Sequence, residues 1–380
     1  MISLTIADIA RITGGQLVAV PRGASLGAID GVGGRLAEAV GTRQIDTVTA
    51  DSRTVAQGTA DGRDATLFVA LRTESGDGHE YVATAFENGA AVALVEGDLH
   101  RFATSTAVPS SSVDRSEHKE RGYAPSSEDD ASAFVVVADT WRALRQLASE
   151  VRRRVDPTVV AITGSVGKTT VKDLTAAIVA TSRRTYASPA SFNNELGVPL
   201  TILGMPADCQ ALICEIGARA PGDIAVLADV ARPDIAVVTA VEAAHLGPFG
   251  SLDAIAATKG ELVTSLGTNG VAVLNLDNAY VAAMATRAPS VIGISMHPGH
   301  GDITPQRVSM RDDARAEIVI DTPWGVVESV LPVPGRHQVV NAMLSIGVAG
   351  ALGIDTGDMG AALTEAQITQ WRGQLLSLGD

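Results

Sequence analysis

Aromatic residues are scarce in this sequence, at 3% of 380 residues, although hydrophobic residues as a whole make up 46%. Ala, Val, Leu and Ile must therefore fill its core, and the length predicts two or three domains. Cysteine is equally scarce. The two thiols, Cys209 and Cys214, are too few for a disulfide framework, and their spacing matches no metal motif. We expect both to be buried thiols of a protein in a reducing cytoplasm.

Positive charge and long apolar runs are also lacking. The 29 Lys and Arg residues stand against 43 Asp and Glu residues, which gives a formal net charge of −14. This balance argues against a nucleic-acid-binding surface, because such a surface needs a basic face. Local cations and helix N-termini can still hold a small anion in an acidic protein. No apolar run reaches membrane-spanning length and the first residues lack the pattern of a secretory signal, so we expect no membrane insertion.

The first part of the chain, residues 1–136, has the pattern of a small α/β domain. Strands are expected at "DTVTADSRTV" and "ATLFVALR", and "HEYVATAFENGAAVALVE" is typical of a helix, a glycine turn and a strand. Residues 104–132 are dominated by Ser, Pro and charged side chains. They predict a flexible insertion in this domain.

Residues 137–370 form the expected second domain, which begins with a strand end and a helix capped near Asp139 or Thr140. Strands and helices then alternate from 157 to about 300, and the strands are nearly continuous apolar runs. Such runs indicate a mostly parallel sheet with helices on both faces. A hairpin with its turn near Pro323 and Gly325 and a helix over "QVVNAMLSIGVAGALG" follow. The predicted fold class is α/β, with a small N-terminal α/β domain and a central domain like that of P-loop nucleoside triphosphatases (NTPases), which has a mostly parallel sheet.

The clearest motif is "ITGSVGKTT", which joins a predicted strand to a predicted helix. Backbone N–H groups of such a turn and the helix N-terminus can converge on a phosphate, a lysine can reach its outer oxygens, and a threonine hydroxyl can bind Mg²⁺. The commonest version of the motif has a glycine where Ile162 stands here. A glycine turn followed by an exposed lysine is therefore the alternative interpretation. The predicted nucleotide-binding residues are Gly164, Ser165, Val166, Gly167, Lys168, Thr169 and Thr170.

Three further candidates follow predicted strands or lie close after them. Glu215 ends an apolar strand, where a carboxylate can bind the Mg²⁺ of a nucleotide, and His245 lies in the loop beyond the next strand. Lys259 lies inside a predicted helix, where it could neutralise phosphate or be converted into an anionic group. Taken singly, each of them is more typical of an ordinary surface or core residue.

These stretches together resemble the Mur ligase family of bacterial cell-wall synthesis. The resemblance covers nearly the whole chain, and "NNELGVP" and "AHLGPFGS" are similar to the member that adds a terminal dipeptide. The matching stretches of the second domain are "ITGSVGKTTVKDL", "FNNELGVPLTIL", "EIGARAPGDI", "AHLGPFGSLDAIAATKGEL", "LNLD" and "VPGRHQVVNAMLSIGVAGALG". Those of the first domain are "ADSRTV", "LFVAL" and "DGHEYVATAFENGAAVALV".

The resemblance implies an ATP-dependent ligase that joins D-Ala-D-Ala to UDP-N-acetylmuramoyl-tripeptide through an acyl phosphate, in the cytoplasm and as a monomer. It assigns Lys168 to the phosphates, and Thr169 with Glu215 to the first of two Mg²⁺ ions. His245 would assist the second Mg²⁺, and Lys259 would carry a carbamate that acts as an anionic oxygen ligand. The remaining assignments are Asn193 and Asn194 near the phosphates and substrate, Asn275, His337 and Asn341 near the adenine, and Ser52 and Arg53 near the UDP part.

The end of the chain departs from the family pattern. Family members continue into a third, Rossmann-like domain that binds the dipeptide, whereas residues 371–380 match only the start of a linker. We therefore expect a truncated form that binds its nucleotide ligands but has impaired turnover. Another Mur ligase, a ligase like folylpolyglutamate synthase and a non-catalytic protein that binds ATP and UDP-sugar are the alternatives.

Overall fold

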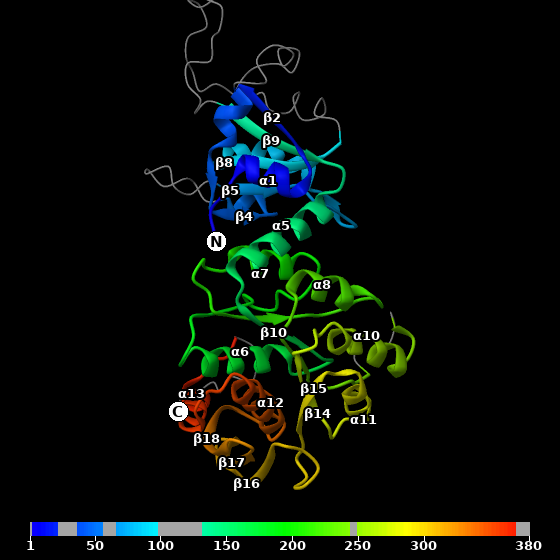
Figure 1. Cartoon of the computed structure of the whole chain (residues 1–380), viewed down its shortest axis with the longest axis vertical. Coiled ribbons are helices and arrows are strands. Elements are labelled where there is room, and N and C mark those ends of the chain that lie inside the picture. Colours follow the sequence, from blue (N-terminus) through cyan, green and yellow to red (C-terminus); the bar gives the residue numbers. More distant parts are fainter. Residues whose placement is uncertain (1, 22–35, 56–65, 98–130, 244–248, 370–380) are drawn as a thin grey trace, which may run out of the picture. The chain divides into compact units, whose positions relative to one another are not determined.

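The structure is a computed structural model, and it describes residues 2–21, 36–55, 66–97, 131–243 and 249–369. The chain divides into two compact units, Met1–Val151 and Arg152–Asp380, which are described separately below (Figure 1). The division between the two units falls within one helix, α5 (Thr140–Val155). The domain boundary predicted between residues 136 and 137 therefore stays a prediction. None of the described helices combines the length and the apolar character needed to span a bilayer.

The first unit is built on a five-stranded mixed sheet in the order β2-β9-β8-β5-β4. Its strands pair in parallel except for β2 with β9, which is antiparallel. Phe86 and Phe134 pack edge-to-face in the core of this unit, with their ring centroids 5.3 Å apart. Two of the few aromatic side chains thus lie in this core. The strands are β2 (Gln16–Pro21), β4 (Thr47–Thr49), β5 (Thr66–Val69), β8 (Ala90–Glu96) and β9 (Ala131–Val137).

Short elements complete the first unit. The strand expected through "DSRTV" is wrong: a 3₁₀ turn, η2 (Ser52–Thr54), stands there instead. The helix–turn–strand expected after it is confirmed by η3 (Gly78–Tyr81), α3 (Val82–Glu87) and β8. The other elements are β1 (Leu4–Thr5), α1 (Ile6–Thr13), β3 (Gln44–Ile45), β6 (Arg72–Thr73) and β7 (Gly76–Asp77).

The insertion predicted at 104–132 falls mostly outside the described residues. Residues 104–130 are not described, and 131 and 132 are already part of β9. The predicted start of α5 is confirmed, because the Asp139 carboxylate accepts a hydrogen bond of 2.9 Å from the backbone N–H of Arg142. Such a bond satisfies one of the free donors of the first helical turn.

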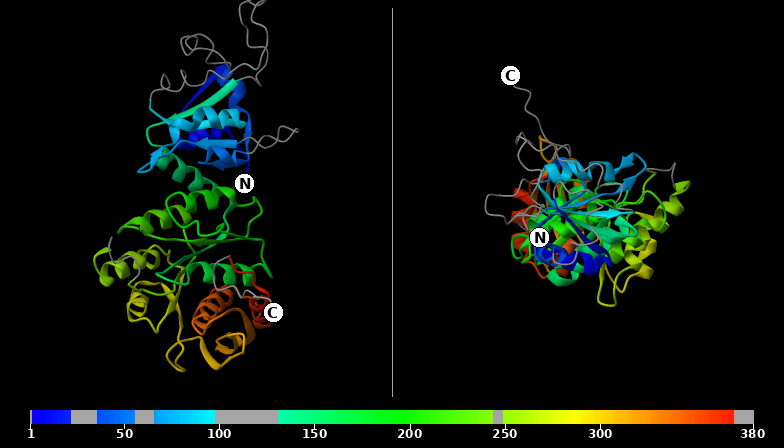
Figure 2. Two further views of the ribbon diagram at one scale, coloured as in Figure 1. Left: turned by 180° about the vertical axis from the view of Figure 1, so that it is seen from behind. Right: turned by 90° about the horizontal axis from the view of Figure 1, so that it is seen from above.

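The second unit contains a six-stranded parallel sheet in the order β11-β12-β10-β13-β14-β15. The predicted parallel sheet is thereby confirmed. Its strands are apolar on both faces because helices cover both, with α6 and α7 on opposite sides (Figures 1 and 2). The strands are β10 (Thr158–Thr163), β11 (Thr185–Ala187), β12 (Ala211–Glu215), β13 (Ile235–Val238), β14 (Val271–Asn275) and β15 (Ser290–Ile294).

The chain first moves from β10 outward to β11, returns through β12, and then crosses to β13 on the other side of β10. In open α/β sheets the ligand site lies beyond the carboxyl ends of the strands at such a reversal. The helices that make these crossings are α6 (Lys168–Val179), α7 (Gly197–Gly204), α8 (Asp223–Ala231), α10 (Leu252–Thr264) and α11 (Ala279–Ala282), with a 3₁₀ segment η5 (Ala283–Arg287).

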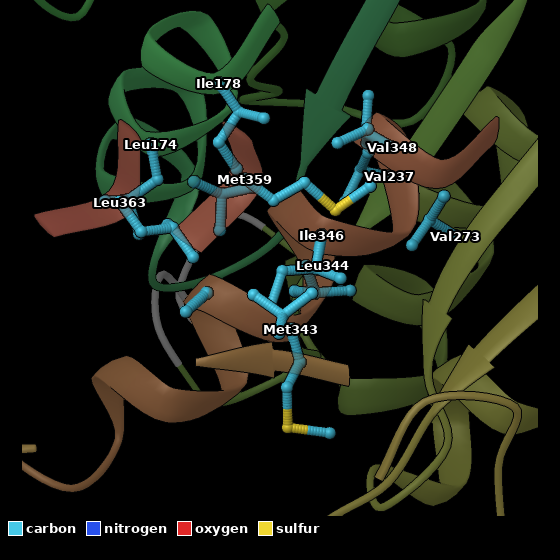
Figure 3. Close-up of a cluster of buried hydrophobic side chains, with 14 of the residues drawn as sticks. Leu174, Ile178, Val237, Val273, Met343, Leu344, Ile346, Val348, Met359 and Leu363 are labelled. Carbon is cyan, nitrogen blue, oxygen red and sulfur yellow. The ribbon is translucent and has the colours of Figure 1, made fainter. Parts of the chain in front are cut away.

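A three-stranded antiparallel sheet and two helices follow. The predicted hairpin is confirmed by β17 (Arg315–Thr322) and β18 (Gly325–Pro334), with β16 (Thr304–Met310) beside them. The helix predicted next is α12 (Gln338–Ala351), and α13 (Thr356–Glu365) follows it. Leu174 of α6, Met343 of α12 and Leu363 of α13 belong to one buried cluster that joins these helices to the large sheet (Figure 3).

Both cysteines are buried, as expected. Burial raises the pKa of the Cys214 thiol to about 12. A thiol with so high a pKa does not form the reactive thiolate near neutral pH.

Candidate nucleotide site at the carboxyl edge of the parallel sheet

The carboxyl ends of the central strands meet at one edge of the six-stranded sheet. Ile162 of β10 is in register with Glu215 of β12, and Thr163 is in register with Val238 of β13. The loop after β10 therefore leaves the sheet between the ends of β12 and β13. This position brings the glycine turn and Glu215 to the same edge, as the strand ends in the sequence suggested.

Gly164 shows why the turn after β10 has no side chain at this point. Its φ is +148°, and a Cβ atom added there would lie 1.8 Å from the hydroxyl oxygen of Thr239. That hydroxyl donates a hydrogen bond of 2.5 Å to the carbonyl of Val166, so it ties the loop to the end of β13. Both backbone conformation and packing thus require glycine at this position.

Gly167 ends the turn and is the N-cap of α6, with φ +85°. A Cβ there would come within 2.6 Å of the side-chain oxygen of Asn341 in α12. As a glycine, this N-cap has no side chain that could bond to the first N–H groups of α6. They lie at the positive end of the helix dipole, which is a favourable place for a phosphate.

Two lysines lie near this turn. The Lys168 ammonium donates a hydrogen bond of 2.8 Å to the Gly164 carbonyl. Lys259 of α10 is 9% exposed, and its burial, together with the positive charge of Lys168, lowers its pKa to about 8. The two cations repel each other at short range, which a bound polyanion would relieve.

Glu215 is the buried carboxylate of the site, with 1% of its surface exposed. One carboxylate oxygen accepts a hydrogen bond of 2.9 Å from the Thr169 hydroxyl, and the other accepts one of 2.8 Å from the Asn193 side-chain amide. The hydroxyl oxygen of Ser191 lies 3.5 Å from that of Thr169. These oxygen atoms are the ligand type that Mg²⁺ prefers.

This donor set fits a magnesium ion that accompanies a nucleotide. The described residues contain no cluster of three or more His, Cys, Asp or Glu side chains. A nucleotide-bound Mg²⁺ does not need such a cluster, because it takes one or two protein oxygens together with phosphate oxygens and waters. Thr169 and Glu215 are the residues that would hold it.

The two predicted asparagines, Asn193 and Asn194, make different contacts. Asn193 contacts Glu215, whereas the side-chain oxygen of Asn194 accepts hydrogen bonds from Leu196 at 3.3 Å and Gly197 at 2.8 Å. Asn194 therefore caps the start of α7. Its role toward a substrate stays a prediction.

Of the three positions predicted near the adenine, one lies against the phosphate loop and one bonds to Thr239, the residue whose hydroxyl holds that loop. The Asn275 amide donates a hydrogen bond of 3.0 Å to the carbonyl of Thr239, and Asn341 lies against Gly167. His337 directly precedes α12, and its ring contacts the Gln338 side chain at 3.0 Å. His245, the predicted second magnesium ligand, lies outside the described residues.

Sequence reasoning missed three residues of this site: Thr239, Ser191 and Ser188, whose hydroxyl accepts a hydrogen bond of 3.2 Å from the backbone N–H of Glu215. Thr239 follows β13 directly, so its position at a strand end was the available signal. Ser188 and Ser191 follow β11, a strand of three residues that was not recognised in the sequence.

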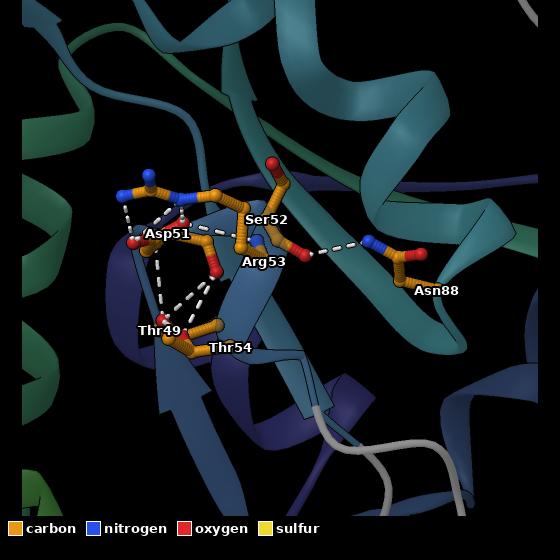
Figure 4. A network of polar contacts seen from close by, with 6 residues as sticks. All are labelled: Thr49, Asp51, Ser52, Arg53, Thr54 and Asn88. Atoms are coloured by element: carbon orange, nitrogen blue, oxygen red, sulfur yellow. Dashed lines mark hydrogen bonds and ion pairs between the residues drawn. The ribbon is translucent and has the colours of Figure 1, made fainter.

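The predicted UDP-binding residues lie in the first unit. Ser52 and Arg53 form η2, which Asp51 caps and Asn88 holds through a hydrogen bond of 2.9 Å to the Ser52 carbonyl (Figure 4). The guanidinium of Arg53 lowers the pKa of the Asp51 carboxyl to about 2. The Arg53 side chain is 86% exposed, so it can exchange this carboxylate for a ligand phosphate at little cost.

A cavity of about 840 Å³ lies elsewhere, at the amino ends of β10, β13 and β14. Its buried Arg152 donates hydrogen bonds to the carbonyls of Ala231 and Arg232. Its Glu261 accepts hydrogen bonds from the backbone of α8. These lining groups are engaged in holding the fold, and the cavity lies at the opposite edge from the phosphate loop, so we assign it no part in the site.

Comparison with known proteins agrees with this geometry. A family model for the Mur ligase middle domain matches residues 162–349. UDP-N-acetylmuramoyl-tripeptide–D-alanyl-D-alanine ligase of Mycobacterium tuberculosis (strain ATCC 25618 / H37Rv) is 36% identical over 389 aligned residues, which cover 100% of this chain and 69% of that protein. The chain belongs to the Mur ligase family.

Other relatives within the Mur ligases give the same result. The ligase with the same name in Escherichia coli (strain K12) is 32% identical over 313 residues, covering 81% of this chain and 61% of that protein. The crystal structure of MurF from Acinetobacter baumannii superimposes with a TM-score of 0.75 and 27% identity, covering 97% of this chain and 70% of that one. The chain thus spans roughly two thirds of the length of its Mur ligase relatives.

Proposed function

We propose that this chain carries the sugar-nucleotide-binding and ATP-binding parts of a ligase that adds D-Ala-D-Ala to UDP-N-acetylmuramoyl-tripeptide. The observation that carries the proposal is the contact of Thr169 and Glu215 beside the Gly164–Lys168 turn. A phosphate cradle, a lysine and a buried carboxylate at one sheet edge are the parts that Mg-ATP needs. The names of the relatives supply the substrates.

The chemistry explains why cations gather at this edge. A substrate carboxylate attacks the γ-phosphorus of ATP, the bond to ADP breaks, and an acyl phosphate forms. An amine then attacks the acyl carbon, and phosphate leaves. A carboxylate and a triphosphate repel each other, so their approach needs positive charge and close positioning. Lys168 and the N-terminus of α6 supply both, and bound Mg²⁺ would neutralise further phosphate charge.

Lys259 has the environment that the proposed carbamate requires. Only an uncharged amine adds to CO₂, and a pKa of about 8 leaves a fraction of Lys259 uncharged near neutral pH. Addition to CO₂ and loss of a proton turn the buried cation into an anion with two oxygen atoms. This exchange would remove its repulsion with Lys168, and we propose that the carbamate and His245 belong to a second Mg²⁺ site.

Two further assignments complete the proposal. Ser52 and Arg53 would bind the UDP part in the first unit. Asn275, His337 and Asn341 would lie near the adenine, since one of them lies against the phosphate loop and another bonds to the residue that holds this loop. We propose a cytoplasmic activity, as the substrates imply.

The first test of this function is nucleotide binding. Isothermal calorimetry with ADP and Mg²⁺ is expected to detect binding by the 380 residues, and weaker binding of GDP. Lys168→Met should lower the ADP affinity by about tenfold or more, because a charge-assisted phosphate contact is worth roughly 1.5–3 kcal/mol. Arg307→Met removes an exposed cation of β16 in the same unit and should leave ADP affinity unchanged. Equal ADP affinity of Lys168→Met and the unsubstituted chain would contradict the proposed site.

The second test separates a ligase from a binding protein. Phosphate release from ATP is measured with UDP-N-acetylmuramoyl-tripeptide, in the presence and absence of D-Ala-D-Ala. Assayed alone, these 380 residues are expected to bind nucleotide but to form product slowly, because they align with only 69% of the length of the mycobacterial ligase. Rapid ligation by the 380 residues would refute the impaired turnover, while binding with no phosphate release at all would favour the non-catalytic alternative.

A further inference from the structure

Lys172 is a buried cation that the proposed chemistry does not use. It lies in the second turn of α6 and is 3% exposed. Its ammonium donates hydrogen bonds of 2.9 Å to the carbonyls of Ser188 and Ala190, and it lies 3.1 Å from a carboxylate oxygen of Asp173. Its three N–H groups thus have three acceptors, which is the condition under which a buried ammonium is tolerated.

The carbonyls that Lys172 holds belong to the loop that surrounds Glu215. The Ser188 hydroxyl accepts a hydrogen bond of 3.2 Å from the Glu215 backbone N–H. Five residues later, Asn193 donates its amide to the Glu215 carboxylate, and its carbonyl accepts a hydrogen bond of 2.7 Å from Gly217. We call residues 188–193 the carboxylate loop. Its two ends set the position and direction of the Glu215 carboxylate.

The carboxylate loop does not hold its shape by backbone preference alone. Ala190 has a φ of +46°, in the left-handed region that a residue with a Cβ rarely adopts. Such a conformation persists only where surrounding bonds impose it. The hydrogen bond from Lys172 to the Ala190 carbonyl is one of these bonds.

We propose that Lys172 is a positioning residue, which acts through the carboxylate loop to aim Asn193 and Glu215 at the metal of the bound nucleotide. The proposal rests on the nucleotide function proposed above. Groups that orient a metal ligand affect metal affinity strongly although they do not touch the metal. A purely structural role of Lys172 would instead change stability and leave the magnesium requirement as it is.

The test compares Asp173→Asn with the double variant Lys172→Met/Asp173→Asn. The single variant removes the ion pair, but its side-chain oxygen can still accept the hydrogen bond of 2.8 Å that Asp173 receives from the Thr369 backbone. The double variant also removes the two bonds to the carboxylate loop and leaves no buried carboxylate unpaired. The difference between the two variants therefore reports the loss of the Lys172 ammonium together with its bonds to Ser188 and Ala190. Lys172→Gln in the same background keeps an amide donor and replaces the methionine variant if that one does not fold.

The first measurement is hydrogen exchange in the absence of ligand. The amides of Phe192 and Gly217, which donate to Pro189 and Asn193, should exchange faster in the double variant than in Asp173→Asn. Amides of β10 should be unaffected. Equal exchange at Phe192 and Gly217 in the two variants would overturn the proposal, whatever the nucleotide results are.

The second measurement is the Mg²⁺ concentration that half-saturates ADP binding, obtained by equilibrium dialysis. It should rise by about tenfold in the double variant and stay near that of the unsubstituted chain in Asp173→Asn. Faster loop exchange with an unchanged magnesium requirement would also overturn the proposal. If the unsubstituted chain binds no ADP with Mg²⁺, the proposed function itself is wrong. Because this outcome needs no variant, it can be told apart from a failure of the role proposed for Lys172.

Discussion

Gly164 is the residue whose replacement should damage the proposed phosphate cradle most directly. We predict that Gly164→Ala destabilises the chain by about 2 kcal/mol or more, because the new methyl group would both clash with Thr239 and adopt a rare backbone conformation. Relief of the clash requires the loop to move away from β13, so ADP binding should be lost. Denaturant unfolding and calorimetry with ADP and Mg²⁺ measure the two effects.

Gly267 provides the matched control for this prediction. No atom lies within 4 Å of a Cβ added there, and its backbone is not in the left-handed region. Gly267→Ala should therefore change stability by no more than about 0.5 kcal/mol and leave ADP binding intact. Retained ADP affinity in Gly164→Ala would show that the turn does not need the close approach to Thr239.

The Lys259 side chain should make stability depend on pH in the alkaline range. Its pKa is lowered from 10.5 to about 8 in the folded chain, so between these values the unfolded chain binds more protons. The contribution of Lys259 to stability must then rise with pH, by roughly 1 kcal/mol per pH unit near pH 9, whereas Cys214, whose pKa burial raises to about 12, makes an opposite contribution above pH 9. Below about pH 8 Lys259 is charged in both states, and its contribution no longer changes.

Unfolding by guanidinium chloride at pH 8 and pH 10, in CO₂-free buffer with a chelator, measures this contribution. Lys259→Met has no proton to release and should lack this contribution, so its stability should fall relative to that of the unsubstituted chain between pH 8 and pH 10. Arg307→Met keeps Lys259 and should show the same pH dependence as the unsubstituted chain. An identical pH dependence in Lys259→Met would mean that Lys259 makes no such contribution.

Sequence alone identified those residues of this site that belong to local sequence patterns. The turn from Gly164 to Thr169 and the strand end at Glu215 are each recognisable from a short continuous stretch of sequence. The contacts of Thr239 and Lys172 could not be predicted in this way, because they are made with segments far along the chain, even though the strand-end position of Thr239 could be read from the sequence. The hydroxyl of Thr239 reaches the phosphate loop because β13 pairs with β10. The sequence of neither strand shows that the two strands pair.

At the scale of elements, long periodic segments were predictable and short ones were not. The apolar runs of the parallel strands predicted their elements, because burial on both faces dictates such runs. The turn η2 was predicted as a strand because it was taken as the continuation of the strand that precedes it, β4. The Asp51 carboxylate accepts the N–H of Arg53, and this local side-chain bond favours a turn over the strand ladder.

The close contact of α13 with β18 depends on Gly360, although glycine is a poor helix former. A Cβ added at Gly360 would lie 2.3 Å from the backbone oxygen of Glu328, which cannot rotate away. We predict that Gly360→Ala destabilises the second unit by about 1–3 kcal/mol, although alanine is the better helix former. Thermal or denaturant unfolding gives the free energy of this change.

Ala361→Gly tests intrinsic helix preference at the neighbouring exposed position. It should cost about 1 kcal/mol or less, since only backbone entropy is lost there. If Gly360→Ala instead stabilised the chain by a similar amount, the close contact between α13 and β18 would be wrong, and helix preference alone would decide the outcome.

At the scale of the whole molecule, composition alone could argue only against broad classes of protein, such as nucleic-acid-binding proteins. Net charge is an average over the whole surface and does not show where cations gather. In this acidic chain Lys168, Lys259 and the start of α6 lie near one another at the carboxyl edge of the parallel sheet, where they would favour a polyanion. The ordered set of motifs predicted the family, and the comparisons confirm it. Motif order could do this because several of the motifs stand at the ends of strands, and the sheet determines the positions of those strands.

The two units should respond separately to the two proposed nucleotide ligands, since each has its own sheet and core. ADP with Mg²⁺ stabilises only the states that bind it, by about 2.7 kcal/mol at a hundredfold excess over its Kd. Hydrogen exchange should therefore slow in β10, β12 and α6, while β5 and β8 of the first unit keep their rates. UDP should give the reverse pattern through Ser52 and Arg53. Protection of β5 and β8 by ADP, or of β10 by UDP, would contradict the assignment of one ligand to each unit, because a ligand can protect only those segments whose opening releases it.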